Sequence, residues 1–130
     1  MNWTIIGLVG IAAATAVVVV MRQGNQKVIS PEQLQRSIGQ GERMLLLDVR
    51  TPREFNSGHI PGAVLLPHDR LLSSPGELPH QGEGMIIVYC ERGPRARMAQ
   101  KALIKGGFSN VLHLKGDMSL WRARDLPLEK

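Results

Sequence analysis

The stretch MIIVYCERGPRARMAQKALIKGG, residues 85–107, decides how the rest of the chain is interpreted. Its apolar start, Met85–Tyr89, predicts a buried strand, and the single cysteine, Cys90, follows directly. Apolar residues then recur at helical spacing from about Arg95 to Lys105, where two glycines end the pattern. The sequence therefore predicts a strand, a tight loop and a helix, with a thiol close to the helix N-terminus.

The loop after the cysteine is rich in positive charge. Arg92, Arg95 and Arg97 lie within seven residues of Cys90, and only Glu91 opposes them. Helix N-terminal amides and nearby guanidinium groups favour a thiolate over a thiol. We therefore expect the pKa of Cys90 to be lowered and the site to attract small anions. The alternative from these residues alone is a cysteine that serves as a small core residue.

Length and composition limit the possible functions. The chain has 130 residues, one cysteine and a formal net charge of +5, which allows one domain plus at most an appendage. A single cysteine excludes an intrachain disulfide, a zinc cluster of cysteines and a CxxC pair, so we predict no metal and no cofactor. The basic residues are scattered and aromatic residues are few, so we do not expect nucleic acid as a partner.

The first residues of the chain form a long apolar run. Residues 3–21 contain no charged side chain over 19 positions, which predicts a helix that spans a membrane. We therefore expect an anchor at 1–22 and a linker at 23–27. Basic residues follow this run and none precedes it, which places the C-terminal domain on the cytoplasmic side. The alternative is a secretory signal cleaved near its alanines, which would make the domain periplasmic.

The remaining residues, 28–130, alternate between strand and helix patterns. Strands are expected near Lys27–Ile29, Met44–Val49, Ala63–Leu66, Met85–Tyr89 and Val111–Leu114. This order predicts an α/β domain with a central, mostly parallel five-stranded sheet flanked by helices. Such sheets bind ligands at the carboxyl ends of their strands, where Asp48 ends the second strand and Cys90 follows the fourth.

Three motifs, in this order, resemble signatures of the rhodanese-type sulfurtransferases. They are DVRTPREF at 48–55 with GHIPGA at 58–63, CERGPRA at 90–96, and a closing pattern that runs from Gly107 to Pro127. The similarity covers roughly residues 28–128. With its apolar start, the whole chain is similar to bacterial membrane-anchored, single-domain members, which implies a single-pass protein of the bacterial inner membrane.

The resemblance implies a double-displacement reaction. Cys90 would take the sulfane sulfur of an anionic donor such as thiosulfate as a persulfide, and would pass it to a thiol or to cyanide. The implied roles in the loop and in substrate binding fall on Glu91, Arg92, Gly93, Pro94 and Arg95, with Asp48 and Arg50 as supporting residues. A glycine in so short a loop also predicts a positive φ at Gly93.

This chain departs from the family pattern at several positions. Ala96 stands where many members carry Ser or Thr, and Glu91 occupies a position that is often basic, so the physiological donor stays open. Gly116–Asp117 replaces a glycine pair, which we expect to change loop geometry at most. Two other hypotheses remain: a non-catalytic docking module for a membrane partner, and a redox or persulfide sensor with one cysteine.

Overall fold

The computed structural model describes residues 27–76, 78 and 84–130. The predicted membrane anchor at 3–21 and the predicted linker up to residue 26 lie outside the described residues. Within the described ranges, no helix combines the length and the apolar character needed to cross a bilayer. The α/β domain that starts at residue 28 lies inside the described part.

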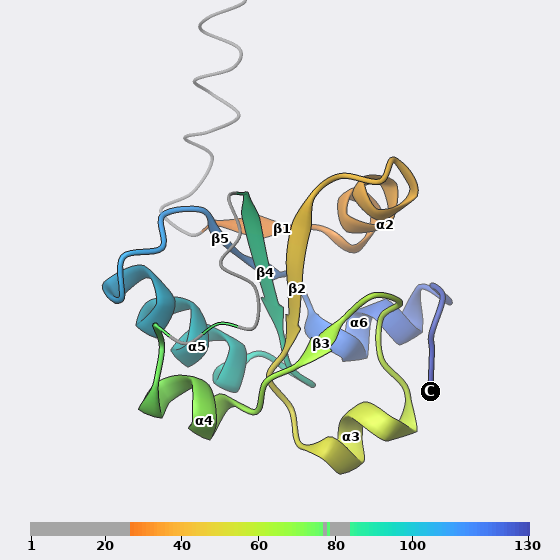
Figure 1. Ribbon diagram of the computed structural model, residues 1–130. Coiled ribbons are helices and arrows are strands. Elements are labelled where there is room, and N and C mark those ends of the chain that lie inside the picture. The colour runs from red at the N-terminus through yellow and green to blue at the C-terminus, as the bar shows by residue number, and fades with distance from the viewer. Residues whose placement is uncertain (1–26, 77, 79–83) are drawn as a thin grey trace, which may run out of the picture.

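Five parallel strands form one central sheet in the order β1-β5-β4-β2-β3 (Figure 1). The strands are β1 (Val28–Ile29), β2 (Met44–Asp48), β3 (Val64–Leu65), β4 (Met85–Tyr89) and β5 (Val111–Leu114). Every pair of neighbouring strands in this sheet is parallel, which confirms the predicted architecture. Asp48 lies opposite Tyr89, so the carboxyl ends of β2 and β4 lie side by side, and the segments that follow them start next to each other.

Helices connect these strands. They are α2 (Pro31–Gly39), α3 (Pro52–Ser57), α4 (His68–Ser73), α5 (Pro94–Lys105) and α6 (Asp117–Ala123). Ser30 and Thr51 each cap a helix, with a proline at the first turn and a capping box closed by Gln33 and Glu54. The local sequence therefore fixes where α2 and α3 begin.

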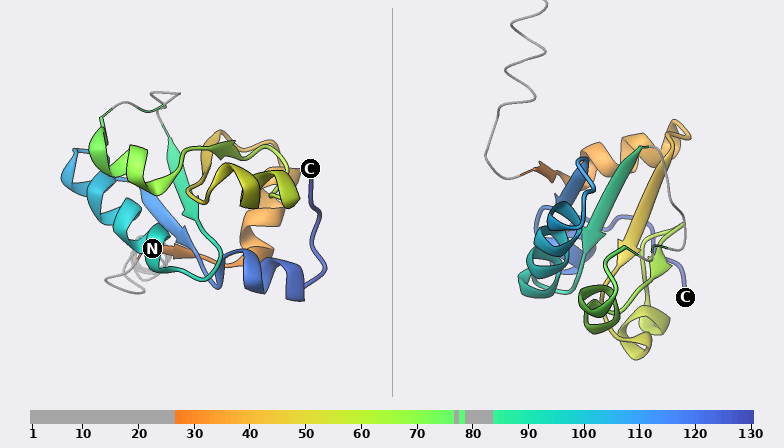
Figure 2. Two further views of the ribbon diagram at one scale, coloured as in Figure 1. Left: turned by 90° about the horizontal axis from the view of Figure 1, so that it is seen from below. Right: turned by 60° about the vertical axis from the view of Figure 1, so that its left-hand side comes forward.

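Two hydrophobic cores lie on the two faces of the sheet. One face is covered by α4 and α5, and the other by α2 and α6 (Figures 1 and 2). Successive residues of β2 serve both cores, since Leu45 and Leu47 face α5 whereas Leu46 faces α2 and α6. This explains the nearly continuous apolar run of the strand. The buried apolar residues all lie between Ile29 and Trp121, so both cores close within the described domain.

Candidate functional site: the loop after β4

Cys90 lies at the carboxyl edge of the sheet, directly after β4 and three residues before the N-cap of α5. The Gly93 N–H donates to Cys90 Sγ at 3.0 Å. Gly93 has a φ of +125°, which confirms the predicted positive φ. A Cβ at this position would lie 2.8 Å from Arg97 Nη1 and 3.2 Å from Asp117 Oδ2. The backbone conformation therefore favours glycine at this position, and a Cβ would in addition crowd the carboxylate of Asp117, whereas the end of the Arg97 side chain could move.

The first turn of α6 holds the backbone of the loop from the other side. Met118 N donates to the Cys90 carbonyl at 3.0 Å, and Ser119 N donates to the Glu91 carbonyl at 3.1 Å. The carboxylate of Asp117 accepts the Cys90 N–H at 3.0 Å. Because the carbonyls of Cys90 and Glu91 are bonded to α6, they are not turned toward the sulfur atom. The polarity of the loop around Sγ is therefore set by N–H groups.

The thiol itself is shielded, which corrects the prediction of a lowered pKa. Cys90 is only 1% exposed, and this burial raises the pKa of its thiol. The backbone N–H groups of Ala96, Gly93 and Arg92 act to lower that pKa, whereas the nearby charge of Asp117 raises it further. Removal from water penalises the charged thiolate more than the amides favour it. The expectation that the loop keeps the resting thiol ionised was therefore wrong.

Arg95 reaches across to α3. Its Nη1 and Nη2 atoms donate to the two carboxylate oxygens of Glu54 at 2.6 and 3.0 Å. This hydrogen bonding with Arg95, supported by the Thr51 N–H and opposed by partial burial, lowers the pKa of Glu54 to about 2. A bidentate pair of this kind fixes the start of α5 against the start of α3. An anionic donor would have to compete with Glu54 for Arg95.

The other cations and the proline of the loop face outward. Arg92 is exposed and makes no ion pair with any residue that the structure describes. Pro94 is also exposed and is the first residue of α5. Its lack of an N–H costs nothing there, because N–H groups in the first turn of a helix have no partner within the helix. Among the described residues, Arg92 of the loop and Arg97 of α5 are thus the exposed cations near Cys90 that form no ion pair and can meet an anion from solvent.

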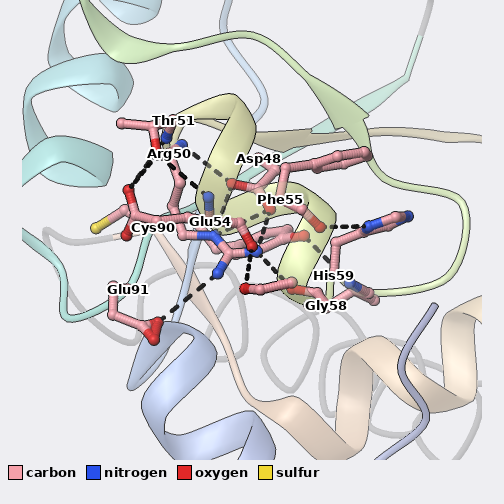
Figure 3. A network of polar contacts seen from close by, with 12 residues as sticks. Asp48, Arg50, Thr51, Glu54, Phe55, Gly58, His59, Cys90 and Glu91 are labelled. Atoms are coloured by element: carbon pink, nitrogen blue, oxygen red, sulfur yellow. Dashed lines mark hydrogen bonds and ion pairs between the residues drawn. The ribbon is translucent and has the colours of Figure 1, made fainter. Parts of the chain in front are cut away.

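The predicted supporting residues form a buried ion pair beside the loop (Figure 3). Arg50 is 1% exposed, and its Nη2 donates to Asp48 Oδ2 and to the Gly58 carbonyl, each at 2.7 Å. Arg50 Nη1 lies 3.8 Å from a carboxylate oxygen of Glu91. The structure therefore brings Asp48 and Arg50 next to the Cys90 loop, where they tie β2 and the end of α3 to Glu91.

Glu91 also pairs with Arg122 of α6. Its carboxylate is thus held between Arg50 and Arg122, and both partners balance its charge. The sequence suggested that an acidic residue here opposes a bound anion. The two ion pairs reduce that opposition, because the carboxylate is bonded to the protein's own cations.

The sequence interpretation missed the importance of Asp117 and His113. Asp117 is 2% exposed, and its Oδ1 accepts both the Cys90 N–H and a hydrogen bond from His113 Nε2 at 2.9 Å. We expected residues 116–117 to change only loop geometry, but this carboxylate contacts the backbone of the cysteine itself. Its position after β5, the strand next to β4, could have indicated it by the same reasoning that singled out Asp48.

The side chains that could bind a metal ion do not cluster in the described part of the chain. Within residues 27–76, 78 and 84–130, no group of three or more His, Cys, Asp or Glu side chains is placed to hold a metal ion. The arrangement that the described residues do offer is a single sulfur nucleophile facing backbone N–H groups at the start of α5. Such a site suits covalent catalysis in which sulfur carries the transferred group.

A parallel α/β sheet with a single-thiol loop at its carboxyl edge defines the class of protein. The family model of the rhodanese-like domain matches residues 30–124, and the chain belongs to this family. A sulfurtransferase of Allochromatium vinosum is 33% identical over 100 residues, which cover 77% of this chain and 92% of that protein. Thiosulfate sulfurtransferase 16, chloroplastic, of Arabidopsis thaliana is 37% identical over 91 residues, which cover 62% of this chain and 76% of that protein.

Larger relatives and solved structures agree with this assignment. The chain spans about a quarter of the length of the probable adenylyltransferase/sulfurtransferase MoeZ of two Mycobacterium tuberculosis strains, to which it is 33% identical over 99 residues. The crystal structure of the Alr3790 protein from Anabaena sp. superposes with a TM-score of 0.69 at 30% identity. That match covers 78% of this chain and 90% of the Anabaena chain. The fold and the family thus rest on a match over the whole domain and not on the three motifs alone.

Proposed function

We propose that this protein is a sulfurtransferase that moves sulfane sulfur from an anionic donor such as thiosulfate to a thiol or to cyanide. The observation that carries this proposal is the position of Cys90 Sγ, which accepts the Gly93 N–H at 3.0 Å in a loop whose carbonyls are bonded elsewhere. A ring of N–H donors stabilises negative charge on sulfur. The names of the Allochromatium and Arabidopsis relatives support sulfur transfer, and the Arabidopsis name supports thiosulfate as donor.

The reaction consists of two displacements. The Cys90 thiol first loses its proton to solvent, and the thiolate attacks the outer sulfur of thiosulfate. The sulfur–sulfur bond of the donor breaks, sulfite leaves with the bonding electron pair, and Cys90 becomes a persulfide. A cyanide ion or an acceptor thiolate then attacks the terminal sulfur of the persulfide. The new sulfur–sulfur bond breaks, thiocyanate or an acceptor persulfide leaves, and the Cys90 thiolate is restored.

The surroundings of the loop assign the remaining roles. The N–H groups of Arg92, Gly93 and Ala96 stabilise the negative charge on the persulfide, and the positive end of α5 adds to this effect. Arg92 attracts the donor from solvent because it is exposed. Arg50, which is held by Asp48, lies beside the carboxylate of Glu91 and offsets part of its negative charge next to the loop.

The proposal extends to the membrane. The uncharged run at 3–21 would span the bacterial inner membrane once, and the basic residues after it would keep the catalytic domain in the cytoplasm. A periplasmic domain follows instead if this run is a cleaved signal. Carbonate extraction of membranes that contain the full chain, combined with protease protection in spheroplasts, distinguishes the two arrangements.

The burial of Cys90 bears on the two alternatives. A sensor cysteine is usually an exposed thiol of low pKa, so a thiol that is 1% exposed and whose pKa is raised by burial speaks against the redox sensor. The same burial is compatible with a docking module in which the cysteine performs no chemistry. The geometry of N–H donors around Sγ favours the enzyme, and kinetics must separate it from the docking module.

The test is a steady-state assay of thiocyanate formation from thiosulfate and cyanide. We expect ping-pong kinetics, because sulfite leaves before the acceptor binds. Cys90→Ser should abolish thiocyanate formation, while Ser109→Ala, at an exposed position outside the loop, should keep it. Folded wild-type protein that forms no thiocyanate, and that transfers no sulfur to thiol acceptors either, would support the docking module.

A further inference from the structure

The exposed side of α5 combines basic and apolar side chains. Its exposed residues that are basic or large and apolar are Arg97, Met98, Lys101, Ile104 and Lys105. Their spacing places all of them on one side of the helix, opposite the buried Ala96, Ala99 and Leu103. The helix contains no acidic residue. A helix face of this composition is typical of a surface that lies on a membrane.

A groove extends this face toward the start of the domain. It has a volume of about 220 Å³, and its lining includes Lys27, Val28, Arg97, Gln100, Lys101 and Ile104. Gln100 Nε2 donates to the carbonyls of Lys27 and Val111, both at 2.9 Å, so the first described residue is fastened to α5. We call the groove and the exposed side of α5 together the basic-apolar face.

Exposed apolar side chains are concentrated on this face. The large hydrophobic residues with substantial exposure in the described part are Val28, Val64, Met98, Ile104 and Leu128. Three of these five, Val28, Met98 and Ile104, belong to the basic-apolar face, with exposed fractions of 45, 50 and 46%. Exposed apolar groups surrounded by cations are complementary to an anionic bilayer surface, where the cations meet lipid headgroups and the apolar groups reach the acyl chains.

We propose that the basic-apolar face lies against the anionic phospholipid surface of the membrane, and this inference rests on the proposed function only in placing the chain beside a bilayer. Four residues lie between Arg22, at the end of the uncharged run, and Lys27, so five residue-to-residue steps join the two. At about 3.3–3.6 Å per residue, such a segment reaches no further than about 18 Å, so an anchored chain holds Lys27 near the headgroups. The face that contains Lys27 then meets the bilayer first.

Other occupants fit this face less well. A second copy of the chain would bring two cationic faces together and would be repelled. A nucleic acid would pair with the cations, but the face offers no exposed aromatic side chain on which a base could stack, because His113, which also lines the groove, is buried. Of these three occupants, the anionic lipid surface is the one that uses both the positive charge and the three exposed apolar side chains.

The orientation can be measured with the full chain in nanodiscs. In a Cys90→Ser background, a fluorophore is attached to Ile104→Cys on the face, or to Asn56→Cys on α3 as a control. Nanodiscs contain a headgroup spin label and either phosphatidylcholine alone or phosphatidylcholine with phosphatidylglycerol. We expect strong quenching at 104 with phosphatidylglycerol, little quenching at 56, and loss of the difference at high salt. Equal quenching at both positions, or equal quenching at 104 in both lipids, would overturn the proposal.

Charge variants of the 27–130 domain separate this proposal from that of the anchor. The domain contains both complete cores, and its partition to phosphatidylglycerol vesicles requires no anchor. Each basic residue near the surface contributes roughly fivefold to binding, so Lys101→Glu/Lys105→Glu should weaken the partition by about 25-fold or more. The matched reversal Arg53→Glu/Lys130→Glu, away from the face, should weaken it much less.

The test of the anchor and the test of the basic-apolar face can fail separately. If carbonate extracts the full chain from neutral vesicles, residues 3–21 do not anchor it. The vesicle binding of the 27–130 domain then tests the basic-apolar face by itself. If the two double variants weaken vesicle binding equally, the binding depends on the net charge of the domain and not on the basic-apolar face, and the proposal is refuted. A concentration-dependent dimer that is disrupted by Lys101→Glu/Lys105→Glu, without vesicle binding, would assign the face to a second copy and overturn the lipid proposal.

Discussion

At the scale of single residues, two opposing effects act on the sulfur of Cys90. Burial and the carboxylate of Asp117 raise the pKa of the thiol, while the N–H groups of the loop act to lower it. The first effect prevails in the resting protein. The N–H groups nevertheless remain in place for any charge that forms on the sulfur, so the loop is suited to stabilise a persulfide rather than to ionise a thiol.

The raised pKa of Cys90 and the contribution of Asp117 can be tested together. A group whose folded pKa is raised reacts as thiolate only at higher pH, so the rate of iodoacetamide alkylation should rise with pH through a midpoint above the ordinary thiol value of about 8.5. Asp117→Asn retains an oxygen that accepts the Cys90 N–H but removes the charge. We expect this variant to shift the midpoint to lower pH.

Asp125→Asn is the matched control for this experiment, since Asp125 is exposed and lies outside the loop. It should leave the alkylation profile unchanged. A wild-type midpoint below that of a free thiol would contradict the assigned effect of burial. A profile that is the same for wild type and Asp117→Asn, in folded protein, would remove Asp117 from the account.

Arg92 carries a separate prediction because it is exposed and has no described ion-pair partner. Arg92→Gln should raise KM for thiosulfate by about three- to fivefold and leave kcat nearly unchanged, as expected for an exposed charge that attracts the donor. Steady-state kinetics at low and high salt provide the measurement. The difference should shrink at high salt, and a fall in kcat at constant KM would instead assign Arg92 to the chemical step.

At the scale of elements, the loop is held by three neighbours that approach it from different parts of the chain. The N-terminus of α6 bonds the carbonyls of Cys90 and Glu91, Glu54 of α3 holds Arg95, and the Asp48–Arg50 pair at the end of β2 contacts Glu91. Each contact fixes one segment of the loop. The geometry around the sulfur therefore depends on several elements rather than on the motif alone.

The pair of Glu54 and Arg95 predicts a particular acid sensitivity. The folded pKa of Glu54 is lowered to about 2, mainly by its hydrogen bonds with Arg95. The stabilisation is therefore complete above the unfolded carboxyl value of about 4.3 and is lost as the pH falls toward 2. Glu54→Gln should flatten the pH dependence of the free energy of unfolding in this window, as measured by urea denaturation.

Glu42→Gln serves as the comparison, because Glu42 is an exposed carboxylate at the end of α2. The Glu42→Gln variant also lacks one carboxylate, but not one that is bonded to Arg95. If Glu54→Gln and Glu42→Gln give the same curves, the pairing of Glu54 with Arg95 has no measurable effect on stability, and the fixed contact between α3 and α5 must be given up.

The buried pair of Asp48 and Arg50 predicts a large effect on stability. Arg50→Met leaves the Asp48 carboxylate buried without its partner, so the free energy of unfolding should fall by about 3–5 kcal/mol. The double change Asp48→Leu/Arg50→Met should recover part of this loss, because no isolated charge remains. Arg53→Met, at an exposed site on α3, is the control. A loss below 1 kcal/mol for Arg50→Met, in about the range of surface changes, would contradict this account.

At the scale of the whole molecule, the arrangement of elements could be predicted from sequence and the contacts between side chains could not. The apolar run Met85–Tyr89 and the helical spacing from about Arg95 to Lys105 are local signals, and each matched the structure. The partners of Arg95 and Asp117 lie 41 and 27 residues away, and no local pattern reveals them. The raised pKa of Cys90 was missed for the same reason.

The whole fold also separates the proposed chemistry from the proposed contact with the membrane. The Cys90 loop lies at the carboxyl edge of the sheet and at the start of α5, a helix that runs along one face of the sheet (Figure 1). The basic-apolar face follows the exposed side of that helix to Lys27. One helix therefore contributes its N-terminal N–H groups to the sulfur and its exposed side to the lipid surface. Variants such as Lys101→Glu can change one function without touching the other.

Sulfur transfer through Cys90 is the central claim, and intact mass measurement tests it most directly. Wild-type protein is incubated with thiosulfate and freed of excess reagent. Its intact mass is then measured by mass spectrometry before and after addition of cyanide. We predict a gain of one sulfur atom on Cys90, its removal by cyanide with release of thiocyanate, and no gain in Cys90→Ser. Folded wild-type protein whose mass is unchanged by thiosulfate and by a persulfide donor would contradict the account.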